Sequence, residues 1–408
     1  MNYLQAKSLL ESVGQAHLLR YYDELKEEER QELLRQIEET DWSVIDNFYH
    51  PEDLSGKGEI VPIEGLSLEE IDRRKEEFTA VGQDMLRRGK VAAILLAGGQ
   101  GTRLGSDHPK GMYDIGLTRK LYIFECLIHN LQDVVKECGV SVPLYVMTSK
   151  KNHAETVAFF EEHDYFGYDR SAVRFFTQDM APAVDLNGKV FLEEKGKISL
   201  SPNGNGGWFS SLLRSGLMED VRRRGVEWFN VFAVDNVCQR IADPAFVGAT
   251  VLSGCDCGAK AVSKAEPHER VGALCLENGH PSIIEYYELT EEMAQARNAD
   301  GTLKYRYGVI LNYLFALSRL EEIASEKIPV HVVHKKVPYL DENGVLCKPE
   351  TENGCKFETL VLDMIKLMQR CLPYEVRREY EFAPVKNKTG VDSVESAREL
   401  LKRNGVEL

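Results

Sequence analysis

The stretch L-L-A-G-G-Q-G-T-R-L-G-S-D-H-P-K-G, residues 95–111, joins an apolar run at 91–96 to a loop with four glycines, an arginine and a lysine. Glycine lets a ligand come close to main-chain N–H groups, and successive N–H groups in such a loop form a concave anion site. Arg103 and Lys110 add positive charge to this loop. Strand, loop and cations together predict a cradle for a polyphosphate.

Two other glycine-rich loops fit this stretch less well. A dinucleotide fingerprint needs a glycine at position 104, where the chain has leucine, so that match is weak. A P-loop needs a lysine at a fixed distance after its glycines, and that spacing is missing. A tight turn without a ligand remains as the simplest alternative, but four glycines beside Arg103 and Lys110 make it the weaker one.

Length and charge limit what the chain can do. Its 408 residues are enough for one large α/β domain with appendages, or for two domains. The net charge of −15 argues against broad binding to nucleic acid or to an anionic membrane. A polyphosphate would therefore need a local group of cations, and a divalent cation would help to hold it.

The chain also carries signs of its compartment. No apolar run reaches the roughly 20 residues of a membrane helix, and residues 1–20 do not resemble a signal peptide. Nine cysteines are scattered without a C-x-x-C pair. Such an irregular set is typical of reduced thiols, so we expect a cytoplasmic protein.

Strand and helix patterns alternate from residue 91 onward. The apolar spacing predicts strands at 91–96, 142–147, 173–177, 228–234, 270–276 and 282–287, and helices at 121–137, 212–224, 309–325 and 357–370. Asn152 with Glu155 is expected to open a further helix, as is Asp243-Pro244. Turns are predicted at the two Asn-Gly pairs, 187–188 and 278–279.

The region before the first strand is expected to be helical. Residues 3–50 indicate short helices, a looser segment follows at 51–65, and a capping box at Ser67 and Glu70 opens a helix that ends near Gly89. We therefore expect an N-terminal helical region (1–89), a central core (90–330) and a C-terminal α+β segment (331–408) that packs on the core. The fold class is α/β, with a Rossmann-like core around a mostly parallel mixed sheet.

Several ordered motifs carry a family resemblance. The glycine loop with P-K-G resembles the nucleotidyltransferase signature of eukaryotic-type UTP:sugar-1-phosphate uridylyltransferases, and within them it is most similar to UDP-N-acetylhexosamine pyrophosphorylases. Further matching blocks are P-K-G-M-Y-D-I-G-L (109–117), L-E-E-K-G-K-I-S-L-S-P-N-G-N-G-G (192–207), V-D-N (234–236), I-E-Y (284–286) and F-A-P-V-K-N (382–387). They occur in order over roughly residues 90 to 390, which makes the resemblance specific.

The resemblance implies a reaction and a set of nucleotide-binding residues. UTP and a sugar 1-phosphate would give a UDP-sugar and pyrophosphate with Mg²⁺, and the sugar would be N-acetylglucosamine. Catalytic roles fall on Arg103, Lys110 and Lys386. Nucleotide contacts fall on Leu96, Ala97, Gly98, Gly99, Lys110, Gln178, Gly204, Asp235 and Lys356.

The resemblance also assigns the sugar and the metal. Sugar contacts fall on Asn205, Glu285 and Tyr286, and the metal falls on Asp235. From the residues alone, Asp235 follows a buried strand, where a carboxylate can bind Mg²⁺ but can equally serve in a turn. Lys386 and Glu285 could likewise be ordinary solvated residues.

One position departs from the family pattern. Many acetylhexosamine pyrophosphorylases have an asparagine facing the sugar in a G-N-I step, where this chain has Val309. A UTP–glucose-1-phosphate enzyme, or one of broad sugar specificity, is therefore the alternative. A non-catalytic protein that binds nucleotide sugars is the second, and an oxidoreductase is a distant third. The sequence leaves the oligomeric state undetermined.

Overall fold

The chain forms two compact units, each built from stretches that are separate in sequence. The structure is a computed structural model, and it describes residues 1–50 and 58–408. One unit takes the described residues of 1–56, 179–207 and 327–361, and the other takes those of 57–178, 208–326 and 362–408. We call them the small unit and the large unit. Part of the predicted looser segment, residues 51–57, lies outside the described residues.

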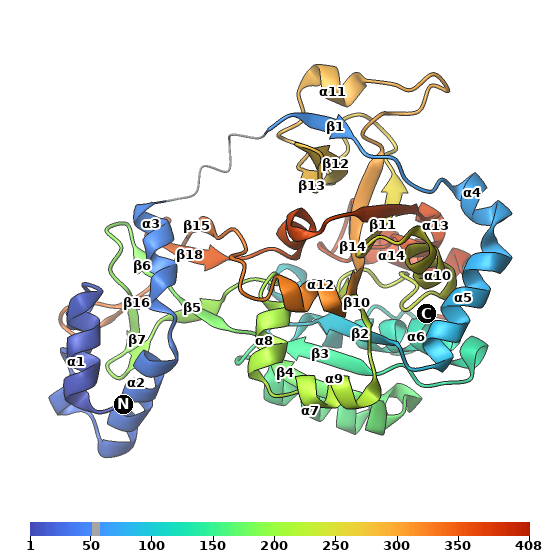
Figure 1. The fold of residues 1–408 in the computed structure, drawn as a ribbon. Coiled ribbons are helices and arrows are strands. Elements are labelled where there is room, and N and C mark those ends of the chain that lie inside the picture. Colours follow the sequence, from blue (N-terminus) through green and yellow to red (C-terminus); the bar gives the residue numbers. More distant parts are fainter. Residues whose placement is uncertain (51–57) are drawn as a thin grey trace. The chain divides into compact units, whose positions relative to one another are not determined.

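The large unit contains a ten-stranded mixed sheet. Its main strand order is β1-β12-β14-β10-β2-β3-β4, with β11 joined to β14 and β19, and β13 joined to β12 (Figure 1). The strands are β1 (Ile60–Pro62), β2 (Val91–Leu96), β3 (Leu144–Thr148), β4 (Val173–Thr177), β10 (Trp228–Ala233), β11 (Cys257–Ser263), β12 (Ala273–Glu277), β13 (His280–Ile284), β14 (Tyr307–Ala316) and β19 (Cys371–Glu375).

Four neighbouring strands of this sheet are parallel and determine where a ligand can bind. In β10-β2-β3-β4, Leu95 pairs with Phe232 on one side and with Val146 on the other. All six residues of β2 are buried, as expected for a strand covered on both faces. The carboxyl ends of parallel strands meet at one edge, where open α/β sheets bind their ligands. The glycine loop starts at this edge.

Helices connect the strands of the large unit. They are α4 (Leu68–Arg73), α5 (Lys75–Arg87), α6 (Ile123–Cys138), α7 (His153–Glu162), α8 (Trp208–Arg214), α9 (Met218–Arg224), α10 (Pro244–Ser253), α11 (Glu291–Gln295), α12 (Leu317–Glu322), α13 (Arg378–Glu381) and α14 (Val394–Arg403). Helix α6 shows how they join the core, because its face from Phe124 to Leu131 is buried in the main apolar cluster.

The small unit has its own core of helices and short strands. Its helices are α1 (Tyr3–Ser12), α2 (Glu27–Glu39) and α3 (Asp46–Tyr49). Its strands are β5 (Met180–Pro182), β6 (Val184–Asp185), β7 (Leu192–Glu194), β8 (Lys197–Ile198), β9 (Leu200–Pro202), β15 (His331–Lys335), β16 (Tyr339–Leu340), β17 (Leu346–Cys347) and β18 (Gly354–Glu358). Leu33 and Ile37 of α2 pack with Val190 and Phe357 in one cluster.

The predicted helix at 309–325 is mostly strand. Residues 307–316 form β14, which pairs with β10, β11 and β12, and only Leu317–Glu322 is helical. The segment is apolar along nearly its whole length, and eight of the ten strand residues are buried. Periodicity cannot separate a strand buried on both faces from a buried helix, so the prediction was wrong for a physical reason.

The predicted helix at 357–370 is also wrong. Residues 354–358 belong to β18, and Val361–Leu367 form a short 3-10 helix. The predicted helices at 67–89 and 212–224 each appear as two pieces, broken at Arg74 and around Gly216. Both Asn-Gly turns form where predicted, and both residues of 278–279 have positive φ, as in a tight hairpin turn.

The fold class itself is confirmed. The chain has an α/β core with a mixed sheet, and helices precede its first long strand. The three-part division at residues 89 and 330 stays a prediction. Within the described residues, no helix has the length and apolar character needed to cross a membrane.

Candidate active site

The glycine loop after β2 folds back on itself. Gly101 N–H donates to His108 O at 2.9 Å, and Lys110 N–H donates to Gly99 O at 3.2 Å. These bonds bring Lys110 next to the start of the loop, although eleven positions separate it from Gly99 in sequence order. Arg103 lies exposed on the same loop. The two predicted cations therefore project from one small structure at the sheet's ligand-binding edge.

Only part of the predicted main-chain cradle is available to a ligand. Ala97 N–H donates to Met147 O at 2.8 Å, and Leu96 belongs to β2. Among the described residues, none accepts a hydrogen bond from Gly98 or Gly99 N–H. Of the four predicted nucleotide contacts at 96–99, Gly98 and Gly99 have N–H groups that a ligand could reach, while Leu96 and Ala97 form the floor of the loop.

Gln178 lies directly against this floor. It follows β4, its side chain is buried, and its N–H donates to Thr148 O at 2.7 Å. A Cβ placed on Gly98 would lie 2.4 Å from Gln178 Nε2, so only glycine allows this approach. The structure thus joins two residues that the sequence predicted separately, and it offers an amide edge beside the loop. A uracil edge has the matching donors and acceptors.

Lys110 faces a carboxylate in a group of positive charges. Its Nζ lies 3.8 Å from Asp235 Oδ2, and the two side chains are 17% and 25% exposed. Burial lowers the pKa of Lys110; Asp235 opposes this shift, and the charges of Lys386 and Arg103 add to it. A phosphate that binds here would offset the repulsion between Lys110 and the other two cations. The surroundings of the ammonium therefore favour the binding of an anion.

Lys386 and a lysine that the sequence reasoning missed belong to the same region. Lys386 Nζ pairs with Asp392 Oδ2 at 3.0 Å, which holds the side chain near its own loop. Lys388 Nζ lies 2.8 Å from where a Cβ on Gly105 would stand, so it lies over the glycine loop. The run K-N-K at 386–388 carried that signal, but only its first lysine was singled out.

Asn152 has a different role from the one predicted. It precedes α7, but its side chain makes no bond to that helix. Instead Oδ1 accepts Ser149 N–H at 2.7 Å, and Nδ2 donates to Ala97 O at 3.0 Å. Glu155, expected to help open the helix, forms an ion pair with His108 of the glycine loop. Both side chains therefore hold the loop rather than cap the helix.

Asp235 is the residue that fits a magnesium ion. It follows β10, and its carboxylate is partly exposed beside Lys110. Within residues 1–50 and 58–408, no cluster of three or more His, Cys, Asp or Glu could hold a metal ion. A single carboxylate is nevertheless enough for Mg²⁺ when substrate phosphates supply other oxygens. The carboxylate of Asp235 fits a metal ion that arrives with a nucleotide.

A second group of predicted residues lies around Gly272, which directly precedes β12, the strand that pairs with both β13 and β14. Glu285 Oε1 lies 3.5 Å from where a Cβ on Gly272 would stand, and Val309 N–H donates to Gly272 O at 2.9 Å. Tyr286, 38% exposed, packs edge-on against Tyr287. The structure therefore brings Val309 close to Glu285, the predicted sugar-binding carboxylate. The rings of Tyr286 and Tyr287 add an apolar surface next to it.

The remaining predicted residues belong to the small unit. Gly204 has φ +88 and runs beside Thr359, while Asn205 Oδ1 accepts Val361 N–H at 2.9 Å. Lys356 lies on β18, three residues before Thr359. Gly204 and Asn205 therefore contact the segment 359–361, and Lys356 lies on the strand that precedes this segment. Because Asn205 Oδ1 is engaged with the backbone, its Nδ2 is the atom left to contact a sugar hydroxyl.

Comparison with known proteins settles the family. A family model described as UTP–glucose-1-phosphate uridylyltransferase matches residues 49–405. The chain belongs to this family. It is 40% identical over 423 residues to UDP-N-acetylhexosamine pyrophosphorylase-like protein 1 of Homo sapiens, covering 97% of this chain and 83% of that one. It is 37% identical over 421 residues to UDP-N-acetylglucosamine pyrophosphorylase of Saccharomyces cerevisiae, covering 96% and 88%.

A solved structure of the same family agrees with the fold. The crystal structure of the uridine diphosphate N-acetylglucosamine pyrophosphorylase from Trypanosoma brucei, in complex with an inhibitor, superposes with a TM-score of 0.81 at 27% identity. The match covers 97% of this chain and 83% of that chain. This family member therefore shares its fold with a pyrophosphorylase over nearly its whole described length.

Proposed function

We propose that this chain is a uridylyltransferase that makes a UDP-sugar and pyrophosphate from UTP and a sugar 1-phosphate. The observation that carries the proposal is the group formed by Lys110, Arg103 and Lys386 with Asp235 at the edge of the parallel strands. Relatives named as N-acetylglucosamine or N-acetylhexosamine pyrophosphorylases support N-acetylglucosamine 1-phosphate as the sugar substrate.

The proposed reaction needs positioning and charge neutralisation. An oxygen of the sugar 1-phosphate forms a bond to the α-phosphorus of UTP, and the bond from that phosphorus to the bridging oxygen breaks, so that pyrophosphate leaves. The attacking phosphate is already ionised, so no general base is required. Lys110, Arg103 and Lys386 stabilise the charge that builds up on the phosphate oxygens, and such preorganised cations supply much of the catalysis of phosphate transfer.

Other side chains would hold the two substrates. Gln178 against Gly98 receives uracil. Glu285 and Tyr286 contact the sugar. Asp235 would hold Mg²⁺, which would neutralise part of the negative charge of the triphosphate. Nine free cysteine thiols support a reducing, cytoplasmic compartment.

A panel of sugar 1-phosphates tests the proposal. Purified protein with UTP and Mg²⁺ is given N-acetylglucosamine, glucose or galactose 1-phosphate, and pyrophosphate release is measured. We expect the highest kcat/KM with N-acetylglucosamine 1-phosphate. No release with any sugar would instead support a non-catalytic binding protein.

Val309 gives the panel a specific variant. Because Val309 lies beside Gly272 near Glu285, Val309→Asn adds an amide at the sugar corner. One added hydrogen bond is worth about 2- to 10-fold in kcat/KM. We expect the ratio of N-acetylglucosamine 1-phosphate over glucose 1-phosphate to rise by about that factor. An unchanged ratio would contradict the placement of Val309 at the sugar.

A further inference from the structure

The segment that carries Lys386 is joined to the loop that carries Asp235. Val385 N–H donates to Asp235 O at 2.8 Å, and Val237 N–H donates to Ala383 O at 3.3 Å. These bonds form a short antiparallel bridge between Asn236 and Pro384. Two proposed site residues that lie 151 positions apart in sequence thus share one piece of backbone structure.

Asn236 supplies the side-chain part of this junction. It is 1% exposed, and both polar atoms of its side chain bind the Lys386 segment. Oδ1 accepts Ala383 N–H at 2.9 Å, and Nδ2 donates to Glu381 O at 2.8 Å. Its own carbonyl accepts a hydrogen bond from Gln239 Nε2 at 2.9 Å. A buried amide with every polar atom paired fixes one arrangement of the chain.

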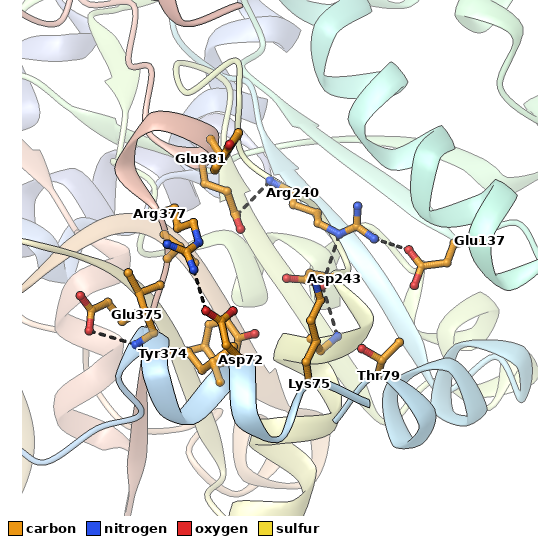
Figure 2. Close-up of a pocket in the computed structure, with 15 residues that line it drawn as sticks. Asp72, Lys75, Thr79, Glu137, Arg240, Asp243, Tyr374, Glu375, Arg377 and Glu381 are labelled. Carbon is orange, nitrogen blue, oxygen red and sulfur yellow. Dashed lines mark hydrogen bonds and ion pairs between the residues drawn. The ribbon is translucent and has the colours of Figure 1, made fainter. Parts of the chain in front are cut away.

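A buried ion group fixes the start of the same segment. Lys260 Nζ, fully buried, donates to Glu381 Oε2 at 2.6 Å, to Asp243 Oδ2 at 3.1 Å and to Arg240 O at 3.0 Å. Arg240 N–H also donates to Glu381 Oε2, at 3.1 Å. Figure 2 shows Glu381 beside the Arg240 backbone, with the Arg240 guanidinium reaching towards Asp243 and Glu137. Glu381 therefore cannot shift without breaking a buried group of charges.

We propose that Asn236 is a positioning residue, whose amide holds the Asp235 loop and the Lys386 segment at a fixed spacing so that carboxylate and ammonium meet the same triphosphate. This role rests on the proposed function. Asn236 touches neither substrate nor metal in this scheme, and it acts through the backbone at 381–385. The buried ion group at Lys260 anchors the far end of that segment.

The spacing matters because phosphate transfer depends on placement. Misplacing a reacting group by about 1 Å can cost about 100-fold in rate. Loss of both Asn236 bonds leaves the segment joined to the Asp235 loop only by the main-chain bonds of Val385 and Val237, so Lys386 can move relative to Asp235. We therefore expect Asn236→Ala to lower kcat by about 10- to 100-fold, while the KM for the sugar 1-phosphate changes much less.

A matched control is available in the small unit. Gln15 is also 1% exposed, and its amide also bridges distant backbone: Oε1 accepts Val190 N–H at 2.9 Å and Nε2 donates to Gly188 O at 2.9 Å. Gln15→Ala removes the same chemistry from a segment that carries no proposed site residue. Both variants should lose thermal stability, but only Asn236→Ala should lose kcat.

A binding measurement separates positioning from simple destabilisation. Mn²⁺ affinity in the presence of UTP, followed by water proton relaxation without sugar 1-phosphate, should weaken in Asn236→Ala and stay unchanged in Gln15→Ala. If Asn236→Ala keeps the wild-type kcat and Mn²⁺ affinity, or if Gln15→Ala shows the same losses, the positioning role is wrong.

Two further measurements keep the outcome clear. If Asn236→Ala fails to fold, Asn236→Ser, which keeps a smaller polar group, takes its place with the same expected losses and the same contradicting result. If the wild-type protein releases no pyrophosphate with any sugar 1-phosphate, the proposed function is wrong. If the wild type is active and the Asn236 variant keeps its kcat and Mn²⁺ affinity, only the positioning role is wrong.

Discussion

In the proposed site, Lys110 is the residue on which we expect the chemistry to depend most. It is mostly buried, faces Asp235 at 3.8 Å, and lies in the field of two further cations. The sequence identified Arg103, Lys110, Asp235 and Lys386 as candidates, but it could not show that Lys110 and Asp235 touch. That contact needs the loop to fold back through the Gly99 and Lys110 backbone.

Removing either loop cation should reduce activity without unfolding the protein. We expect Lys110→Ala and Arg103→Ala to lower kcat/KM for UTP about 100-fold, because each removes a preorganised charge from the phosphates. Steady-state pyrophosphate release measures this effect. Lys120→Ala removes the same charge from an exposed position nearby and should leave the rate within about twofold. Equal rates in all three variants would contradict the site.

The pKa of Lys110 predicts a pH dependence. Burial lowers this pKa from its ordinary value of 10.5, so the ammonium loses its proton at lower pH than an exposed lysine. The charge is present below the lowered pKa and is lost above it. We therefore expect kcat/KM for UTP to fall as pH rises through alkaline values below 10.5. In Lys110→Arg the guanidinium stays charged, so the alkaline fall should disappear even though the rate is lower.

At the scale of elements, the β2 loop and the end of β4 act as one piece. Gly98 allows Gln178 to approach, and Asn152 ties Ala97 to the turn before α7. The glycine pattern predicted the loop, because positive charge and absent side chains are visible in sequence. The role of Asn152 was not visible, because an asparagine before a helix usually caps it.

Gly98→Ala tests the approach of these elements. The added Cβ would meet Gln178 Nε2 at 2.4 Å and push the side chain away, so we expect KM for UTP to rise at least about tenfold. Isothermal titration with UTP and Mg²⁺ gives the corresponding affinity. In a Gln178→Ala background the clash is gone, so Gly98→Ala should add little. Fully additive losses would show that the two residues do not touch.

The failures of prediction among the elements have a common cause. Residues 307–316 are a largely apolar run buried in the large sheet, and residues 354–358 pair with β15 and β6. In both segments the neighbouring strands decide the structure and local periodicity does not. The strands next to the glycine loop were predictable because short apolar runs there end in turn residues. The sequence therefore predicted β2 and the loop at its carboxyl end. It did not predict the strand β14, which pairs with β10.

The whole molecule carries a net charge of −15, yet the proposed site contains a local group of cations. The long-range field opposes the binding of an anionic nucleotide, so the local group of cations must supply the attraction, and a divalent cation on the nucleotide would lower the opposing charge. Composition alone predicts that this acidic protein needs a local group of cations to bind a polyphosphate, but it does not show which residues form that group. The structure shows Asp235 beside Lys110 in this group.

Magnesium should therefore control nucleotide binding to the whole protein. At a UTP concentration 100-fold above Kd, binding adds about 2.7 kcal/mol to the free energy of unfolding. We expect the Tm to rise with UTP and Mg²⁺, and the rise to vanish when EDTA removes the metal. Asp235→Asn should show a smaller Tm rise with UTP and Mg²⁺ than the wild type. A full shift in EDTA would argue against a metal carried by the nucleotide.

A crystal structure of the protein with UTP and Mg²⁺ tests the central claim most directly. We predict that the triphosphate lies against Gly98, Gly99, Arg103 and Lys110, with uracil at Gln178 and the metal at Asp235. Nucleotide bound elsewhere, with this loop empty, would contradict the proposed site.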